Sequence, residues 1–204
     1  MQIIDISLPI HSKMITYPGN PVFATEEFKH YPPLRNSLMH IGSHTGTHID
    51  APRHGVRNGK GIDQMSLTDF IGPCRVLDIT TVKDFIRVAD LKKYKVQRGE
   101  RILVKTKNSL QGFKKFYKKY IFMDPLAAAF LAQKRITLFG IDYLSVKQSG
   151  NPDQGAHTAF LSKNISIIEG LDLSKVKAGN YFLMAIPLRL VGLDASPIRA
   201  VLIK

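Results

Sequence analysis

The stretch His44-Thr-Gly-Thr-His48-Ile-Asp50-Ala-Pro-Arg-His54 places three imidazoles and one carboxylate within eleven residues. Neutral imidazole and carboxylate are common protein ligands of first-row metal ions. The glycine and the two β-branched threonines between His44 and His48 disfavour a helix there. The segment therefore predicts a metal site on an extended strand that ends in a turn.

The spacing of these residues suggests a role for each. His48 and Asp50 are two positions apart, which puts both side chains on one side of an extended strand. His44 is expected to converge on them through the turn. A carboxylate can bridge two metal ions, so Asp50 is the natural shared ligand of a binuclear site. His54 follows Pro52 in a loop and is either a fourth ligand or a free general acid/base, since the pKa of imidazole lies near neutrality.

Two further candidate residues lie more than a hundred positions downstream. His157 stands in Gly155-Ala-His-Thr, where a helix is expected to begin, and Glu169 ends the apolar run that starts at Ile165. A carboxylate at the end of a buried strand emerges at the rim of a sheet. Spacing alone does not distinguish this pair from ordinary structural residues.

The composition of the 204-residue chain fits one domain, residues 1–204, with a full hydrophobic core. Hydrophobic residues make up 44% and charged residues 22%, close to a globular average. The longest apolar run, Tyr181 to Pro187, is far shorter than the roughly 20 residues of a spanning helix, so no membrane association is expected. The N-terminus shows no secretory signal, and the single cysteine, Cys74, is expected to be a buried thiol. These features predict a reduced, cytoplasmic protein.

The net charge of +13 is the unusual feature of the composition. Its densest basic tract is Lys114-Lys-Phe-Tyr-Lys-Lys119, in which aromatic residues separate the lysines. Such a tract could bind single-stranded nucleic acid by stacking and counterion release. No nucleic-acid-binding motif surrounds it, so we interpret it as a solvated face and expect no nucleic-acid partner. Part of the charge could steer anionic substrates.

Strand-length apolar runs bounded by Gly, Pro, Asp or Lys recur along the chain, whereas convincing helices are few. This pattern predicts a mixed α/β fold that is richer in strand than in helix. Long loops are expected at residues 9–36 and 51–67. Strands are predicted at 3–8, 75–80, 101–106, 120–123, 136–141, 165–169, 181–186 and 198–203, and helices at 68–71, 84–93, 124–133 and 156–162.

The first stretch resembles the HxGTHxDxPxH signature of the metal-dependent cyclase-like hydrolases, which include bacterial kynurenine formamidases and isatin hydrolases. The resemblance covers nearly the whole chain. Its other parts are Thr16-Tyr-Pro-Gly-Asn-Pro21, Gly140-Ile-Asp-Tyr-Leu-Ser-Val146, the His157 and Glu169 pair, and Leu193-Asp-Ala-Ser-Pro-Ile-Arg-Ala-Val-Leu202. It implies a swivelling β/β/α domain that assembles as a homodimer or homotetramer.

The resemblance also implies roles for single residues. His44, His48 and Asp50 would bind one metal ion, and Asp50 would bridge to a second. The second ion would also be held by His157 and Glu169, and both ions are expected to be Zn²⁺, with Mn²⁺ as the alternative. His54 matches the catalytic histidine of the family, and Tyr17 falls where an aromatic residue lines the substrate pocket.

The implied activity is arylformamidase: attack of metal-bound hydroxide on N-formyl-L-kynurenine, giving L-kynurenine and formate. The alternative keeps the site and changes the substrate to isatin or another cyclic amide. The C-terminal run favours the formamidases. Three positions depart from the family pattern without removing a ligand: Asn20 and Lys147 replace a common Asp, and Gly170 replaces a common Asn. A serine hydrolase is not supported, because no Gly-x-Ser-x-Gly elbow is present.

Overall fold

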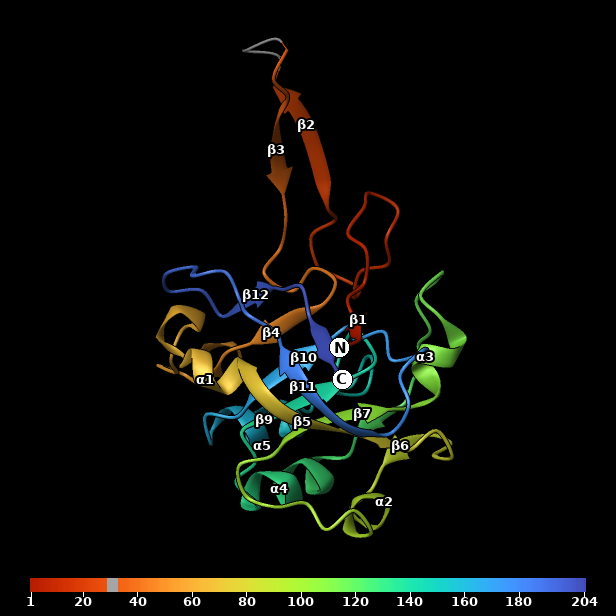
Figure 1. The fold of residues 1–204 in the computed structure, drawn as a ribbon. Coiled ribbons are helices and arrows are strands. Elements are labelled where there is room, and N and C mark those ends of the chain that lie inside the picture. The colour runs from red at the N-terminus through yellow and green to blue at the C-terminus, as the bar shows by residue number, and fades with distance from the viewer. Residues whose placement is uncertain (29–32) are drawn as a thin grey trace.

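The protein is represented by a computed structural model that describes residues 1–28 and 33–204. Nine strands form one large curled mixed sheet, and two short pairs of strands lie apart from it (Figure 1). The nine strands are β1 (Ile3–Asp5), β4 (His48–Asp50), β5 (Ile71–Asp78), β7 (Arg101–Lys105), β9 (Leu138–Ile141), β10 (Ser166–Glu169), β11 (Gly179–Met184), β12 (Ala195–Pro197) and β13 (Val201–Ile203).

The strand order of the large sheet is β1-β13-β11-β5-β7-β9-β10-β4-β12. The four central strands β5, β7, β9 and β10 are parallel, and all other pairings within the large sheet are antiparallel. The carboxyl ends of β9 and β10 therefore lie side by side at the same end of the parallel strands. β4 is the antiparallel neighbour of β10, so the start of β4, with the first histidine stretch, also lies at this end.

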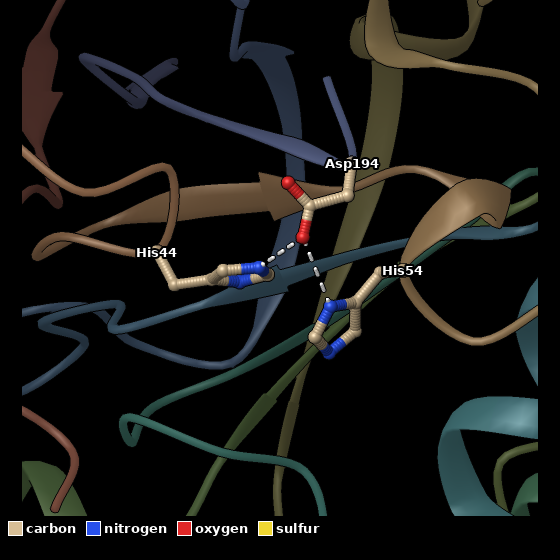
Figure 2. Close-up of side chains that lie close together, drawn as sticks. All are labelled: His44, His54 and Asp194. Carbon is tan, nitrogen blue, oxygen red and sulfur yellow. Dashed lines mark hydrogen bonds and ion pairs between the residues drawn. The ribbon is translucent and has the colours of Figure 1, made fainter. Parts of the chain in front are cut away.

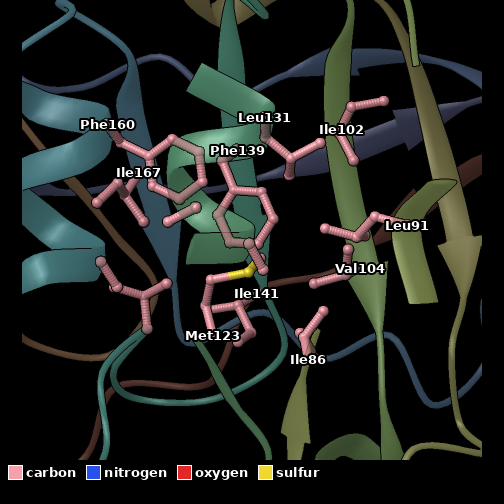
Figure 3. Packing of buried hydrophobic residues seen from close by; sticks show 14 of the residues in the cluster. Ile86, Leu91, Ile102, Val104, Met123, Leu131, Phe139, Ile141, Phe160 and Ile167 are labelled. Atoms are coloured by element: carbon pink, nitrogen blue, oxygen red, sulfur yellow. The ribbon is translucent and has the colours of Figure 1, made fainter. Parts of the chain in front are cut away.

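Both faces of the parallel strands are buried, which explains why the sequence shows continuous apolar runs there. Along β7, Ile102 and Val104 pack on one face of the sheet, whereas Leu103 packs on the other. The first core lies against the helices, where Phe139 and Phe160 stack with ring centroids 4.8 Å apart (Figure 3). The second core fills the curl of the sheet and includes Ile49 from β4.

Helices α2, α4 and α5 lie on one side of the large sheet (Figure 1). In α4, Asp124 is the N-cap, and its Oδ1 accepts the Leu126 N–H at 2.9 Å. Pro125 occupies the first helical position, as expected from its missing N–H. The helical elements are α1 (Leu67–Phe70), α2 (Val88–Lys92), α3 (Lys107–Gln111), α4 (Pro125–Gln133), α5 (Gly155–Leu161), and the 3-10 turns η1 (Pro52–His54) and η2 (Ile62–Gln64).

A hairpin of β2 (Ala24–Phe28) and β3 (Asn36–His40) projects from the body of the protein (Figure 1). The prediction of a loop over residues 9–36 is wrong for β2, and residues 29–32 of that range lie outside the described part of the chain. The second pair, β6 (Phe85–Ile86) and β8 (Phe122–Met123), is parallel. The helix predicted at 84–93 is correspondingly wrong at its start, because Phe85 and Ile86 pair as a strand and the helix begins at Val88.

The predicted fold class is confirmed: the structure is a mixed α/β domain with a large, strand-rich sheet and few helices. Each remaining predicted strand and helix has a counterpart, although several strands are shorter than expected. The loop predicted at 51–67 contains both 3-10 turns. Within the described residues, no helix has the length and hydrophobicity required to cross a membrane.

Candidate metal centre

The pairing of β4 with β10 brings the two predicted clusters together. In this antiparallel register His48 lies opposite Glu169. Residues directly opposite each other have Cβ atoms about 4.5–5.5 Å apart, so the register alone places the imidazole beside the carboxylate. Every residue of β4 and β10 is buried.

The turn before β4 is held by an unusually close approach of two backbone segments. Thr47 Oγ1 donates to the Gly170 carbonyl at 2.6 Å and accepts the Leu8 N–H at 2.8 Å. Gly170 has a φ of +72°, and a Cβ there would lie 2.5 Å from the Gly46 carbonyl oxygen. Only glycine fits this position, which explains why the chain has Gly170 after Glu169.

The predicted ligand side chains converge on Asp50. His44 Nδ1 lies 2.9 Å and His48 Nε2 3.5 Å from Asp50 Oδ1. His157 Nε2, from α5, lies 3.8 Å from Asp50 Oδ2 and 3.3 Å from Glu169 Oε1. Glu169 Oε2 is also 3.5 Å from His48 Nε2. The structure therefore brings together all five residues that the sequence predicts as ligands.

The unpaired polar atoms of this cage fit a bound cation. Neither oxygen of Asp50 has a hydrogen-bond partner among the described residues, and His48 Nε2 also has none. Buried polar atoms without partners are costly. The candidate ligand atoms of His44, His48 and Asp50 lie within 4.8 Å of one another. His48 Nδ1–H donates to the Gly46 carbonyl at 2.9 Å, which leaves the Nε2 lone pair free for a metal.

Two buried carboxylates dominate the electrostatics of the cage. Burial alone would lower the pKa of His48, but contacts with Asp50 and Glu169 outweigh burial and raise that pKa to about 10. Burial opposes ionisation of Asp50, yet the charge of His54 and the other nearby imidazoles keep its pKa well below the usual value. The cage therefore attracts positive charge. A divalent cation supplies this charge while leaving the imidazoles unprotonated.

Asp194 is a site residue that the sequence analysis did not identify. Its Oδ2 lies 2.8 Å from His44 Nε2 and 3.4 Å from His54 Nδ1, so one carboxylate oxygen contacts two imidazoles (Figure 2). The Asp194 pKa is lowered, because contacts with His44 outweigh burial. The signal for Asp194 was its position in the C-terminal run Leu193-Asp-Ala-Ser-Pro, where it is the only acidic residue.

His54 differs in exposure from the buried ligand candidates. Its side chain is 31% exposed, against 2% for His48 and 5% for His157. The His54 ring lies 4.3 Å from the His44 ring and 5.3 Å from the His157 ring, measured between centroids. His54 therefore stands beside the cage with access to solvent.

A cavity of about 190 Å³ opens onto the cage. Tyr17 and Leu144 contribute apolar wall, and His54 is part of the same wall. The Tyr17 ring packs edge-on against Phe116 at a centroid distance of 5.6 Å. The structure thus places Tyr17 in the wall of the cavity beside the candidate metal site, and its role in binding substrate stays a prediction.

The aromatic residues of the basic tract at 114–119 take part in packing inside the protein. Phe116 and Tyr117 are half-buried and pack against the cluster around Tyr143, whereas the four lysines are exposed. The interpretation of the tract as a solvated face agrees with this arrangement. Cys74 is buried in β5, as predicted, and burial raises its thiol pKa to about 12.

The chain is similar to known proteins over nearly its whole length. The family model "Putative cyclase" matches residues 4–148. A kynurenine formamidase from Bacillus cytotoxicus is 34% identical over 204 residues, covering 98% of this chain and 96% of the relative. A kynurenine formamidase from Salinibacter ruber is 32% identical over 206 residues, covering 99% and 97%.

Solved structures agree with this similarity. A structure described as a predicted metal-dependent hydrolase from Bacillus stearothermophilus matches with a TM-score of 0.89 and 36% identity, over 98% of this chain and 97% of the other. Isatin hydrolase A from Ralstonia solanacearum shares the fold, with a TM-score of 0.85 at 22% identity over 100% and 92%. The chain therefore belongs to the cyclase family.

Proposed function

We propose that His44, His48, Asp50, His157 and Glu169 hold two divalent cations, with Asp50 shared between them. The observation that carries this proposal is the buried Asp50 carboxylate, whose two unpaired oxygens face imidazoles from β4, the preceding turn and α5. Imidazole suits zinc better than it suits magnesium or calcium. We therefore propose Zn²⁺, with Mn²⁺ as the alternative.

His54 is the proposed general acid/base. When bound, a divalent cation supplies Lewis acidity that activates water near neutral pH and polarises a carbonyl group. His54 takes a proton from the attacking water and delivers a proton to the departing amine nitrogen. The partial exposure of its ring allows proton exchange with solvent, which the more deeply buried ligand candidates lack.

Asp194 is the proposed positioning residue for His54. Its carboxylate accepts the Nδ1–H of His54, which fixes the tautomer and directs Nε2 away from Asp194. The same carboxylate accepts the Nε2–H of His44, which leaves His44 Nδ1 facing Asp50. One side chain therefore orients a ligand and the acid/base together.

The proposed substrate is an aryl formamide, N-formyl-L-kynurenine. Water adds to the formyl carbon, the C–N bond breaks, and the products are formate and the free aryl amine. Tyr17 and Leu144 provide an apolar wall for the aryl ring. The identity to kynurenine formamidases over nearly the full length supports this substrate over isatin, because the isatin hydrolases share only the fold at 22% identity.

A paired assay tests this function. The protein is purified, its metals are counted by elemental analysis, and hydrolysis of N-formyl-L-kynurenine and isatin is measured side by side. We expect about two metal ions per chain and a higher kcat/KM for N-formyl-L-kynurenine. Preferential hydrolysis of isatin would favour the alternative substrate over N-formyl-L-kynurenine. Full hydrolysis by the metal-free protein would refute the metal mechanism.

We also propose that the enzyme is a homo-oligomer in which the β2–β3 hairpin contacts a second copy. An isolated two-stranded hairpin is at best marginally stable in water. Here Leu38 and Met39 on β3 are 41% and 61% exposed. Light scattering coupled to size-exclusion chromatography should give a dimer or tetramer mass, and Met39→Glu should shift it towards the monomer. A monomeric wild-type protein would contradict this assembly.

A further inference from the structure

The cavity beside the metal centre contains one lysine. Lys147 contributes to its wall together with the amides of Asn20 and Gln154. At about 190 Å³ the cavity is smaller than the roughly 300–1,000 Å³ usual for drug-sized ligands, so a small substrate reaches all of its walls. A lysine in such a wall is a potential partner for a charged group of the substrate.

The protein does not neutralise this lysine. Among the described residues, no carboxylate oxygen lies within 4.0 Å of Lys147 Nζ. The carboxylate that lines the same cavity, Glu169, is already engaged. Its Oε1 accepts the Val146 N–H at 2.6 Å and lies 3.3 Å from His157 Nε2, and its Oε2 faces His48. Among the described residues, no carboxylate therefore competes with a bound anion for the Lys147 ammonium.

The backbone of Lys147 is fixed relative to the metal centre. Its carbonyl accepts a hydrogen bond from the buried hydroxyl of Tyr120, and its N–H donates to Ser145 Oγ at 3.3 Å. The preceding residue, Val146, donates its N–H to Glu169. The Lys147 side chain therefore begins at a backbone position that is held next to a proposed metal ligand.

The electrostatic environment supports an anionic ligand. Lys147 and His157 line the same cavity, so an anion bound there would lie between the ammonium and the proposed metal centre. A neighbouring cavity of about 470 Å³ shares His54 and His157 with the first and is lined by Arg53 and Arg57. A net charge of +13 further favours the approach of anions.

We propose that Lys147 binds the carboxylate of the substrate and makes the enzyme specific for carboxylate-bearing aryl formamides. This inference rests on the proposed function and adds to it the group that the pocket recognises. In N-formyl-L-kynurenine the group is the α-carboxylate, which is ionised at neutral pH. A charge-assisted hydrogen bond is roughly twice as strong as a neutral one, so a neutral analogue of the same shape loses most of the contact.

The test crosses two enzymes with two substrates. N-formyl-L-kynurenine is compared with its α-carboxamide, which has nearly the same shape but no negative charge. The metal-loaded wild type is compared with Lys147→Met, which keeps an apolar stem and removes the ammonium. We expect the substitution to raise KM for the carboxylate substrate about 10-fold, with kcat changed less than about 2-fold, because it removes binding common to ground and transition states. KM for the carboxamide should change less than about 2-fold.

Two variants control this experiment. Lys163→Ala removes one positive charge at the opposite end of the parallel strands, where Lys163 lines a separate groove, and should leave both substrates unaffected. Lys147→Arg should recover most of the affinity for the carboxylate substrate. Metal content and circular dichroism establish that each variant is folded and loaded.

The outcomes separate this inference from the proposed function. An equal loss for carboxylate and carboxamide in Lys147→Met would overturn the role of Lys147 while leaving formamide hydrolysis intact. If the wild type hydrolyses neither compound, the proposed function fails. Calorimetric titration with L-kynurenine and its carboxamide then decides the binding role alone. Tighter binding of the carboxylate that depends on Lys147 supports the inference, and equal binding of the two refutes it.

Discussion

The candidate metal centre has an inner and an outer group of side chains, called the inner wall and the outer wall below, and the two are built in different ways. The inner wall consists of His48, Asp50 and Glu169, which lie on two paired strands and are almost completely buried. The outer wall includes His54 on a 3-10 turn and Asp194 just before β12, with side chains 31% and 36% exposed. Strand register fixes the first group, whereas loops from distant parts of the chain position the second.

This difference predicts unequal responses to substitution. A charge inside the inner wall has no water to compensate it, so removing one partner leaves the others unpaired at a cost of several kcal/mol. Charges at the outer wall retain contact with solvent, and their interactions are screened. Inner-wall substitutions should therefore abolish the metal site, whereas outer-wall substitutions should reduce turnover and leave the metal bound.

The largest effect is expected for His48→Ala. Its Nε2 lies 3.5 Å from carboxylate oxygens of both Asp50 and Glu169, so the variant loses the imidazole shared by the two acids. We expect both stoichiometric metal and measurable hydrolysis to be lost, as elemental analysis and the formamide assay would show. His11→Ala, an exposed histidine outside the site, serves as the control. Wild-type activity in the His48 variant would show that the inner wall is not required for catalysis.

His54→Ala should have the next largest effect. General acid/base catalysis contributes about 10²–10⁴-fold, so kcat should fall by that factor while the metal stays bound. Metal content measured on the same preparation separates the two roles open to this residue. Loss of metal from the variant would assign His54 to the inner wall as a ligand.

Asp194→Asn should reduce kcat by about 10–100-fold, the scale seen when a residue that hydrogen-bonds to a metal ligand is replaced. The amide keeps the shape of the carboxylate but loses the charge that orients His54 and His44. The decisive measurement is the double variant with His54→Ala. If Asp194 acts through His54, the second substitution should add little to the loss. Fully additive losses would mean that Asp194 acts independently of His54.

Sequence reasoning was effective for the inner wall because residues that are close in sequence determine how its side chains are placed. His48 and Asp50 share one side of a three-residue strand, and the alternation of Ile102, Leu103 and Val104 between two cores follows from burial on both faces. The contact of His48 with Glu169 could be predicted only from the family resemblance, because spacing within either segment does not encode the pairing of β4 with β10.

The outer wall and the hairpin were less accessible to sequence reasoning. Asp194 is 150 residues from His44, and no local pattern indicates their contact. The hairpin strands Ala-Thr-Glu-Glu-Phe and Asn-Ser-Leu-Met-His lack the apolar alternation that marks a half-buried strand. The paired strands are exposed, so no pattern of buried apolar residues marks them in the sequence. Both failures concern parts of the molecule whose positions depend on the folded body.

The smallest predicted effect tests whether the inner wall depends on the backbone contact behind it. Gly170→Ala forces a Cβ to within 2.5 Å of the Gly46 carbonyl at a φ of +72°, whereas Gly99→Ala has a similar φ of +79° and open space around the new Cβ. Both should lose about 1–2 kcal/mol of unfolding free energy from the left-handed conformation alone. Gly170→Ala should lose more in urea unfolding, and its metal affinity should fall, because relief of the clash displaces the turn that carries His44 and His48. Equal losses with unchanged metal affinity would show that the turn adjusts freely and that the inner wall is fixed by strand pairing alone.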